Sequence, residues 1–416
     1  MAGTLERRLG LGDAVMVGLG SMLGAGVFVA FAPAAGAAGG LLWLGLLVAA
    51  VVAYCNASSS ARLAARYPES GGTYVYGRER LGPFWGYLAG WAFVAGKVAS
   101  CAAMALTVGA YLWPDRAQLV AAASVLAITA LNYRGVHKSA LATRVIVAVV
   151  LLVLALVVAA AWAGPGAGVG RALGAAAAEP SSRGVLQAAG FLFFAFAGYA
   201  RIATLGEEVR NPARTIPRAI PVALGITVAV YAAVASALGH TLGIAGLASS
   251  TAPLADAVEA AGRRGLIPVV ALGAVVAALG SLLALVLGVS RTVFAMARDG
   301  HLPRALDAVH PVHAVPHRAE LVVGAVVCAL VLAGDVRASI GFSSVCVLAY
   351  YAIANASAWT LRPGPAGRVV PAVGLMGCAV LALALPASSV AAGAATLAAG
   401  TALWVVRHRA HADLHR

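Results

Sequence analysis

Apolar residues run through this chain in blocks that are separated by short polar or charged segments. Each block is about 20 residues long, which is the length that an α-helix needs to cross the hydrocarbon core of a bilayer. The pattern predicts an all-α membrane protein with about twelve transmembrane helices. The expected spans are 12–38, 40–62, 84–112, 117–134, 141–163, 185–208, 218–240, 266–290, 319–335, 338–360, 368–386 and 388–406.

The connections between these spans are short, with four exceptions. The longer segments, which we expect to be loops, are 63–83, 164–184, 241–265 and 291–318. None of them is long enough to hold a separate soluble domain, since domains typically begin at about 50 residues. We therefore expect residues 1–416 to form a single transmembrane domain.

Two spans contain glycine clusters that weaken a helix near the middle of the membrane. The first cluster is GLGSMLGAGVF at 18–28, and the second lies in the sixth span, centred on Gly198. Lipid cannot satisfy the backbone groups that a broken helix exposes, whereas a bound ion or polar solute can. Close packing of helices is the alternative explanation, since small residues let membrane helices approach one another.

The two weakened spans stand five apart in the chain, so the first ten spans divide into two sets of five. Each set then begins with a discontinuous helix, which is the pattern of an inverted repeat whose broken helices meet at the bilayer midplane. We expect the first repeat over 10–163 and the inverted second repeat over 185–360, followed by two extra helices over 368–406.

Composition and charge agree with this interpretation. Hydrophobic residues make up 62% of the chain and charged residues 11%, against about 45–50% and 25% in soluble domains. The formal net charge is +14, and most lysines and arginines fall in segments on the N-terminal side of the spans. This asymmetry predicts a multi-pass protein of the cell membrane with both termini in the cytoplasm.

The positive charge does not indicate nucleic acid as a partner, because no basic run is interleaved with aromatic residues. The five cysteines lie in apolar segments without metal-ligand spacing, so neither a metal nor a cofactor is expected. An enzyme is disfavoured for the same kind of reason, since the sequence lacks an HExxH motif and a nucleophile paired with a base at matching depth.

Four strings of the sequence resemble the amino acid–polyamine–organocation superfamily of permeases, in the same order and spacing over residues 10–400. They are GLGSMLGAGVF at 18–28, YPESGGTYVYGRERLGPFWGYLAGW at 67–91, FFAFAGYARIATLGEEVRNPARTIPRAIP at 193–221 and SRTVFAMARDGHLP at 290–303. Within the superfamily the chain is similar to bacterial amino acid permeases. The resemblance implies ten helices in two inverted five-helix repeats, two peripheral helices, and transport by alternating access.

The resemblance also implies where an amino acid would bind. Its carboxylate would meet free backbone N–H groups of the first break, at Gly24, Ala25 and Gly26. Its amino group would meet backbone carbonyls of the sixth span, at Phe196, Ala197 and Gly198. The polarity of helix ends agrees, because the start of a half-helix carries unpaired donors and the end of one carries unpaired acceptors.

Aromatic residues at such breaks commonly act as gates. Phe28, Phe196 and Tyr199 are the candidates here, with simple packing as the alternative. At the inner end of the sixth span, Glu207 and Glu208 can form ion pairs with nearby arginines that open and close with the inward gate. The alternative for the arginines is a solvated face that obeys the positive-inside rule.

Two charged residues, Lys97 in the third span and Arg201 in the sixth, lie at membrane depth, where charge is costly and usually functional. Both depart from the pattern of the family. Many proton-coupled relatives carry a lysine in span five, and the matching position here is near Val150. Many relatives also carry an acidic residue just after the glycine of span six, where this chain has Ala200.

These departures lead to two hypotheses. Lys97 is the titrating group of a proton-coupled mechanism, since burial favours a neutral amine. Arg201 contacts an anionic or neutral substrate, or closes the inner gate against Glu207 or Glu208. A structural charge that bonds to a broken helix is the alternative for each.

The sequence thus predicts a secondary transporter that moves amino acids, with proton coupling as the first expectation. An exchanger and a sodium-coupled symporter are the alternatives, and a polyamine or organocation antiporter is a weaker one. Sodium would need oxygen ligands from spans one and eight, and Ser281 is the obvious hydroxyl, although serine is also a common packing residue in membranes.

Overall fold

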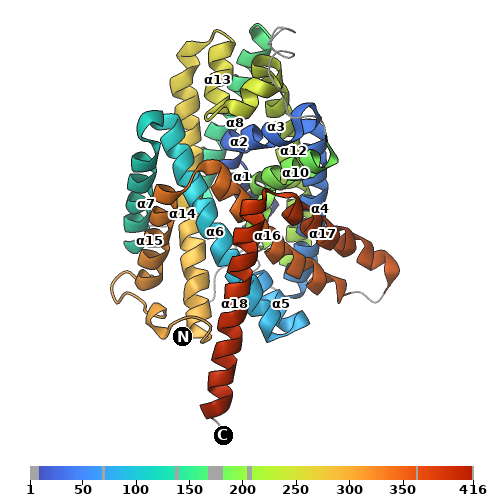
Figure 1. Ribbon diagram of the computed structural model, residues 1–416, viewed down its shortest axis with the longest axis vertical. Helices are drawn as coiled ribbons and strands as arrows, with labels where there is room; N and C mark the ends of the chain where they lie inside the picture. Colours follow the sequence, from blue (N-terminus) through green and yellow to red (C-terminus); the bar gives the residue numbers. More distant parts are fainter. Residues whose placement is uncertain are drawn as a thin grey trace.

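A computed structural model gives the fold of the chain (Figure 1), and it describes residues 9–67, 71–135, 140–166, 181–203, 209–361 and 364–414. Within these ranges the structure is helical. The one backbone bridge of β type in this part of the chain joins Leu9 to Val209.

The helices follow the expected spans in order. The first half contains α1 (Leu11–Met22), α2 (Gly26–Val29), α3 (Phe31–Ala38), α4 (Leu42–Arg66), α5 (Thr73–Leu81), α6 (Pro83–Leu112), α7 (Ala117–Tyr133) and α8 (Ala140–Ala163). The second half contains α10 (Ser182–Phe196), α11 (Ala200–Ala203), α12 (Pro212–Ser249), α13 (Pro253–Ala260), α14 (Ile267–Arg298), α15 (His317–Ala333), α16 (Val336–Trp359), α17 (Pro365–Ala384) and α18 (Ala387–Leu414). Short 3₁₀ turns connect several of them.

Nine helical stretches among the described residues are long and apolar enough to cross a membrane. Helices α7, α10 and α15 also coincide with expected spans, but they have only 17, 15 and 17 residues. Helix α10 is short because its span is interrupted after Phe196. The expected all-α membrane fold is therefore confirmed.

Two of the segments that we expected to be loops contain helices. Helix α5 occupies much of 63–83, and the 241–265 segment holds the end of α12, a kink at Gly243 with a φ of 66°, and α13. Hydropathy missed them because α5 is short and rich in charge, while α13 is far shorter than a span. In the same way α14 continues past residue 290 to Arg298, beyond its apolar part.

The contacts between helices recur with an offset of five spans. Helix α1 packs on α12 and α8, and its counterpart α10 packs on α4 and α16. Each of the pairs α4 with α12, α6 with α14 and α7 with α15 joins a helix to its own counterpart in the other set. Contacts between helices that stand five spans apart are what an inverted repeat predicts.

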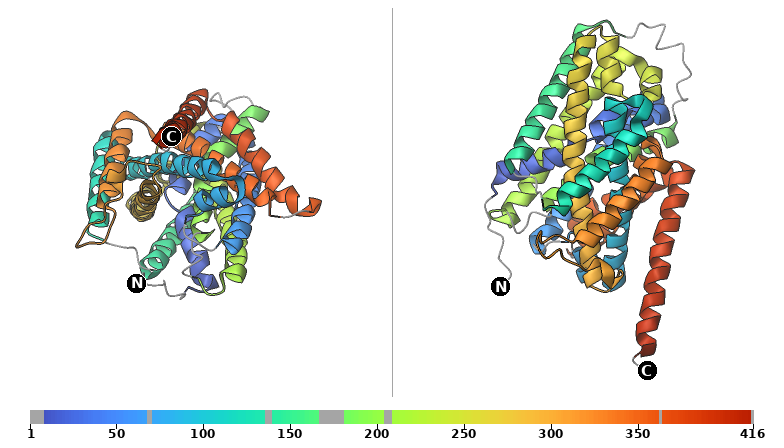
Figure 2. Two further views of the ribbon diagram at one scale, coloured as in Figure 1. Left: turned by 90° about the horizontal axis from the view of Figure 1, so that it is seen from below. Right: turned by 90° about the vertical axis from the view of Figure 1, so that its left-hand side faces the viewer.

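Helices α17 and α18 lie outside these two sets. Helix α17 packs on α16, α4 and α10, whereas α18 packs on α16 and α6 and projects from the bundle (Figure 1). The Arg407 guanidinium of α18 donates a hydrogen bond to the Gly300 carbonyl, 2.8 Å away, just after α14. The end of α18 thus lies on the same side of the bundle as the end of α14 (Figure 2).

Candidate substrate site at two helix breaks

The first span breaks between Met22, the last residue of α1, and Gly26, the first residue of α2. Glycine is required at this break because neighbouring helices come too close for a side chain. A Cβ atom on Gly24 would lie 2.3 Å from Ser281 Oγ of α14, and one on Gly26 would lie 2.7 Å from the Ala195 Cα atom of α10. The glycine cluster therefore interrupts the first span and also lets α10 and α14 pack closely against the break.

The sixth span breaks after Phe196, where α10 gives way to a 3₁₀ turn over Ala197–Tyr199 and then to α11. This second break touches the first. A Cβ atom on Gly198 would lie 2.2 Å from the Ser21 carbonyl oxygen and 2.8 Å from the Met22 backbone nitrogen. The residues expected to bind the two ends of an amino acid are thus brought together.

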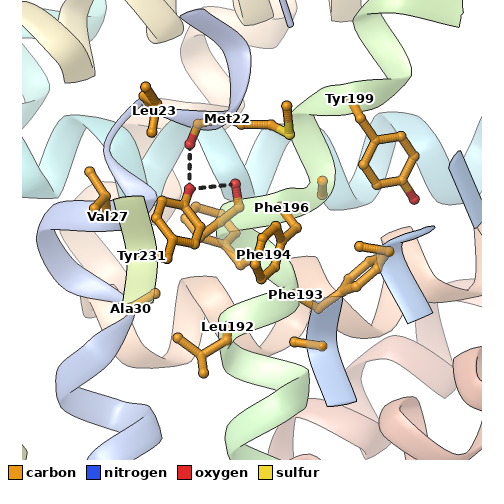
Figure 3. Close-up of a cluster of buried hydrophobic side chains, with 14 of the residues drawn as sticks. Met22, Leu23, Val27, Ala30, Leu192, Phe193, Phe194, Phe196, Tyr199 and Tyr231 are labelled. Carbon is orange, nitrogen blue, oxygen red and sulfur yellow. Dashed lines mark hydrogen bonds between the residues drawn. The ribbon is translucent and has the colours of Figure 1, made fainter. Parts of the chain in front are cut away.

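Tyr231 of α12 joins the two breaks (Figure 3). Its hydroxyl oxygen lies 2.6 Å from the Met22 carbonyl oxygen and 3.0 Å from the Ala195 carbonyl oxygen, and the side chain is fully buried. Both carbonyls belong to the last turn of their helices, where backbone acceptors lack a partner within the helix. The sequence analysis missed Tyr231, although a tyrosine in an apolar span is a signal, because its hydroxyl needs a buried partner.

We expect Tyr231→Phe to lower the free energy of unfolding by about 1–3 kcal/mol, because it leaves two buried carbonyls without their donor. Thermal unfolding of the purified protein in detergent measures the effect. Tyr54→Phe is the matched control, since Tyr54 of α4 is 47% exposed. Equal melting temperatures for the two variants would show that the Tyr231 hydroxyl does not hold the breaks together.

Lys97 reaches the second break from α6. Its Nζ atom donates to the Ala197 carbonyl oxygen at 3.5 Å, and the Tyr351 hydroxyl of α16 donates to the same oxygen at 3.2 Å. The Lys97 side chain is buried. A cation at the C-terminal end of a half-helix is favourably placed, because that end carries partial negative charge. The sequence indicated that Lys97 was functional but not that it meets the sixth span.

Ser281 lies at the first break, as its proposed role in ion binding requires. Its Oγ atom faces Gly24, is buried, and has no hydrogen-bond partner among the described residues. Arg201 is different, because its side chain on α11 is exposed. Glu207 and Glu208, the candidate partners of Arg201 at the inner gate, lie outside the described residues.

The three candidate gating aromatics are all fully buried and in contact with other rings. The ring of Phe28 meets the ring of Tyr111 edge-on at 5.7 Å, Phe196 lies 4.9 Å from Tyr231, and Tyr199 lies 5.1 Å from Tyr351. These contacts fit both a gating role and simple packing.

Tyr111 of α6 covers the first break on the side of α13, and the sequence analysis did not identify it. Its hydroxyl donates to the Phe28 carbonyl oxygen at 2.8 Å and accepts a hydrogen bond from the Leu254 backbone N–H at 3.3 Å. One buried tyrosine thus ties together α2, α6 and α13.

At the end of the bundle opposite to α13 (Figure 1), Tyr74 links α5 to the end of α14. Its hydroxyl donates to the Asp299 carboxylate at 2.5 Å and lies 2.9 Å from His301 Nδ1. Burial, together with the bond to Asp299, raises the pKa of the Tyr74 hydroxyl well above its usual value. The Tyr74 hydroxyl therefore keeps its proton and remains a hydrogen-bond donor to Asp299.

Comparison with known proteins agrees with this geometry. Residues 13–364 match the family model described as amino acid permease. An uncharacterized transporter of Mycobacterium tuberculosis is 67% identical over 414 residues, which cover 97% of this chain and 92% of that protein.

More distant relatives carry more specific names. The branched-chain amino acid permease BcaP of Bacillus subtilis is 25% identical over 76% of this chain and 72% of its own length. The human cationic amino acid transporter 4 is 29% identical over 88% of this chain and 63% of its own length. These relatives are transporters rather than enzymes, and the chain belongs to the amino acid permease family.

Proposed function

We propose that this protein carries an amino acid across the cell membrane by alternating access, and that the amino acid binds where the two helix breaks meet. The observation that carries the proposal is the contact between the breaks, in which Gly198 lies on the end of α1 and Gly26 lies on α10. A zwitterion needs donors and acceptors at one place, and the start of α2 and the end of α10 supply them.

The polarity of the site favours one orientation of the substrate. The carboxylate binds the free N–H groups at Gly24, Ala25 and Gly26. The amino group binds carbonyls of the second break, of which Ala197 already accepts from Lys97 and Tyr351. A substrate amino group therefore competes with Lys97 for the Ala197 oxygen.

This competition supports proton coupling through Lys97. A charged lysine and a charged substrate amino group repel each other at one carbonyl, so substrate binding favours release of the lysine proton. Loss of the substrate on the other side of the membrane lets Lys97 take up a proton again. Each substrate that binds therefore releases one proton on the side from which it came, and each substrate released lets one proton bind on the other side, so the proton moves in the direction opposite to the substrate.

The same geometry bears on which amino acids are carried. BcaP is named for branched-chain amino acids and the human relative for cationic ones. In this chain Lys97 is buried and adjoins the site, and a second positive charge on the substrate would add to the repulsion there, which disfavours a cationic side chain, a polyamine or another organocation. We propose neutral amino acids as the substrate class, with exposed Arg201 at the inward side of the second break.

Sodium coupling is the second candidate, and the buried hydroxyl of Ser281 favours it, because this oxygen faces Gly24 without a partner. Under the proton proposal, Ser281→Ala keeps proton-driven uptake within about fivefold of the wild type, or about 1 kcal/mol, because the Ser281 hydroxyl has no hydrogen-bond partner in the described chain to lose. Uptake into proteoliposomes under imposed Na⁺ or proton gradients measures this. Ser124→Ala on α7 is the control. A sodium-driven uptake that Ser281→Ala abolishes would replace the proton proposal.

We further propose the topology expected from the sequence, with repeats over 10–163 and 185–360, peripheral helices over 368–406 and both termini in the cytoplasm. The five-span offset in the helix contacts supports the repeats. The bridge from Leu9 to Val209 and the bond from Arg407 to Gly300 support termini on one side.

Counterflow of labelled amino acids in proteoliposomes, with and without a pH gradient, tests the proposed function. We expect exchange of neutral amino acids without a gradient, and net uptake when the interior of the proteoliposomes is made more acidic than the exterior. If no pH gradient alters the transport, the protein would be an amino acid exchanger and not a proton-coupled transporter. Lysine or arginine outcompeting neutral amino acids would overturn the proposed substrate class.

A further inference from the structure

Glu320 is a buried carboxyl group that the substrate site does not use. It lies in the first turn of α15, and its side chain is fully buried. Neither of its carboxyl oxygens has a hydrogen-bond partner among the described residues. Among all the residues that the structure describes, Glu320 and Lys97 are the two buried residues with an ionisable acidic or basic side chain of the Asp, Glu, Lys or Arg type.

Other polar groups lie near Glu320, and two of their atoms also lack a hydrogen-bond partner in the described chain. Ser290 of α14 and Asn132 of α7 are its polar neighbours. The Asn132 Oδ1 atom has no partner, while its amide donates to the Leu283 carbonyl at 3.3 Å. Thr129, one turn before Asn132, packs against Gly324, one turn after Glu320, and its hydroxyl is also unpartnered. Polar groups of three helices thus converge on one buried point.

Charged and titratable groups near this point come from α6, α7, α14 and α15, and His310 and His313 also contact the ring of Tyr133. Arg291 of α14 is a cation that acts on Glu320, and its side chain is exposed. Helix α6 contributes the Cys101 thiol, α7 ends in Tyr133, and α15 itself contributes His317, whose ring meets that of Tyr133. The 3₁₀ turn η5 (Arg304–Leu306) contributes Leu306 to the same interface. None of these groups forms a hydrogen bond with Glu320 in the described chain.

A carboxylate in such a place is unstable unless it gains a proton or a partner. Removing a charge from water without a compensating bond costs several kcal/mol, so a carboxyl group in this environment takes up a proton instead. The start of α15 offsets part of this cost, because a helix N-terminus favours negative charge. Because the cost of burial and the stabilisation by the helix N-terminus oppose each other, the Glu320 carboxyl group can both bind and release a proton.

We propose that Glu320, with Ser290 and Asn132, forms a proton-binding site at the interface of α7, α14 and α15, separate from the substrate site. The proton binds one carboxyl oxygen and leaves it for water when α14 and α15 separate. Neutral Glu320 can donate to the unpartnered oxygen of Asn132. The charged form accepts from Ser290 when that hydroxyl turns away from the Val286 carbonyl oxygen, to which it donates at 2.8 Å.

Helix α14 connects this site to the first break. Ser290 and Ser281 lie nine residues apart on that helix, which is about 14 Å along its axis, and Ser281 faces Gly24. Protonation of Glu320 fixes α14 against α15 and thereby the position of Ser281. This effect on transport rests on the proposed function, whereas proton binding itself does not.

The test compares wild-type protein, Glu320→Gln and the control Glu79→Gln, whose carboxylate is exposed on α5. Infrared difference spectra are recorded in detergent while the pH is raised from the ordinary glutamate range, about 4.3, to above neutrality. We expect a protonated-carboxyl band that persists well above that range in the wild type and in Glu79→Gln, and that is missing from Glu320→Gln. Melting temperatures over the same pH range give a second measurement.

The sign of the stability effect follows from proton linkage. The folded wild type holds a proton that the unfolded chain has released, so raising the pH destabilises it. Glu320→Gln has no proton to release at this position. Its melting temperature should therefore fall less than that of the wild type as the pH rises. Identical pH dependence of the two proteins would overturn the proposal. If Glu320→Gln does not fold, the infrared spectrum of the wild type tests the proposal instead. Ser290→Ala should then shift the protonated-carboxyl band. A wild type that lacks this band would also overturn the proposal.

These readouts do not require transport, so the proposal can fail or succeed independently of the proposed function. In proteoliposomes that transport amino acids, Glu320→Gln should keep counterflow and flatten its dependence on pH. An unchanged pH profile of transport would exclude the link through α14.

Discussion

Replacing Gly198 by alanine should reduce amino acid counterflow by about tenfold or more. A methyl group at this position would lie 2.2 Å from the Ser21 carbonyl oxygen and 2.4 Å from its carbon. These are backbone atoms, so the clash is relieved only by moving the end of α1 away from α10. Such overpacking typically costs 1–3 kcal/mol, and a misplacement of about 1 Å at a binding site can cost more than the clash itself.

The control for this experiment is Gly225→Ala. Gly225 lies inside α12, and a Cβ atom added there meets nothing within 4 Å. Alanine favours a helix over glycine by about 1 kcal/mol, so Gly225→Ala should transport like wild type. Both variants are first checked for folding by size-exclusion chromatography. Wild-type counterflow in a well-folded Gly198→Ala would mean that the substrate does not bind at the contact between the breaks.

Replacing Lys97 by methionine should abolish the stimulation of uptake by a proton gradient while leaving counterflow in place. Methionine is similar in length and apolar, so it fills the buried space without a proton-binding amine. The Ala197 carbonyl loses one of the two side-chain donors that the described chain gives it but keeps Tyr351. Uptake with and without an imposed pH gradient measures the change.

A second variant separates the charge of Lys97 from its titration. Arginine keeps a positive charge but does not lose its proton in proteins, so Lys97→Arg should also lose proton coupling. Arg116→Met is the matched control, because it removes an exposed cation of the turn that follows α6. Full proton dependence in Lys97→Met would show that another group carries the proton, and Glu320 would be the next to test.

The sequence was sufficient to locate the two helix breaks, and the reason is local. Glycine weakens a membrane helix wherever it clusters, so Gly24, Gly26 and Gly198 marked the breaks without any knowledge of packing. The depth of Lys97 was evident for a similar reason, because charge inside an apolar span is rare. These features depend only on neighbours along the chain.

The partners of these groups were not evident from the sequence. That Tyr231 bonds to both breaks depends on how α12 crosses α1 and α10, and the contact of Lys97 with Ala197 depends on the register of α6 against α10. Glu320 was overlooked because it stands at the polar edge of its span, where an acidic residue looks solvated. Only the packing of α7 and α14 shows that it is buried.

The central claim is that an amino acid binds between the two breaks, and a cryo-electron microscopy map of the protein with a bound neutral amino acid tests it most directly. We predict density whose carboxylate meets the backbone nitrogens at Gly24 and Gly26 and whose amino group meets the Ala197 carbonyl oxygen. Density in any other part of the protein, with the breaks still in contact through Tyr231, would contradict this account.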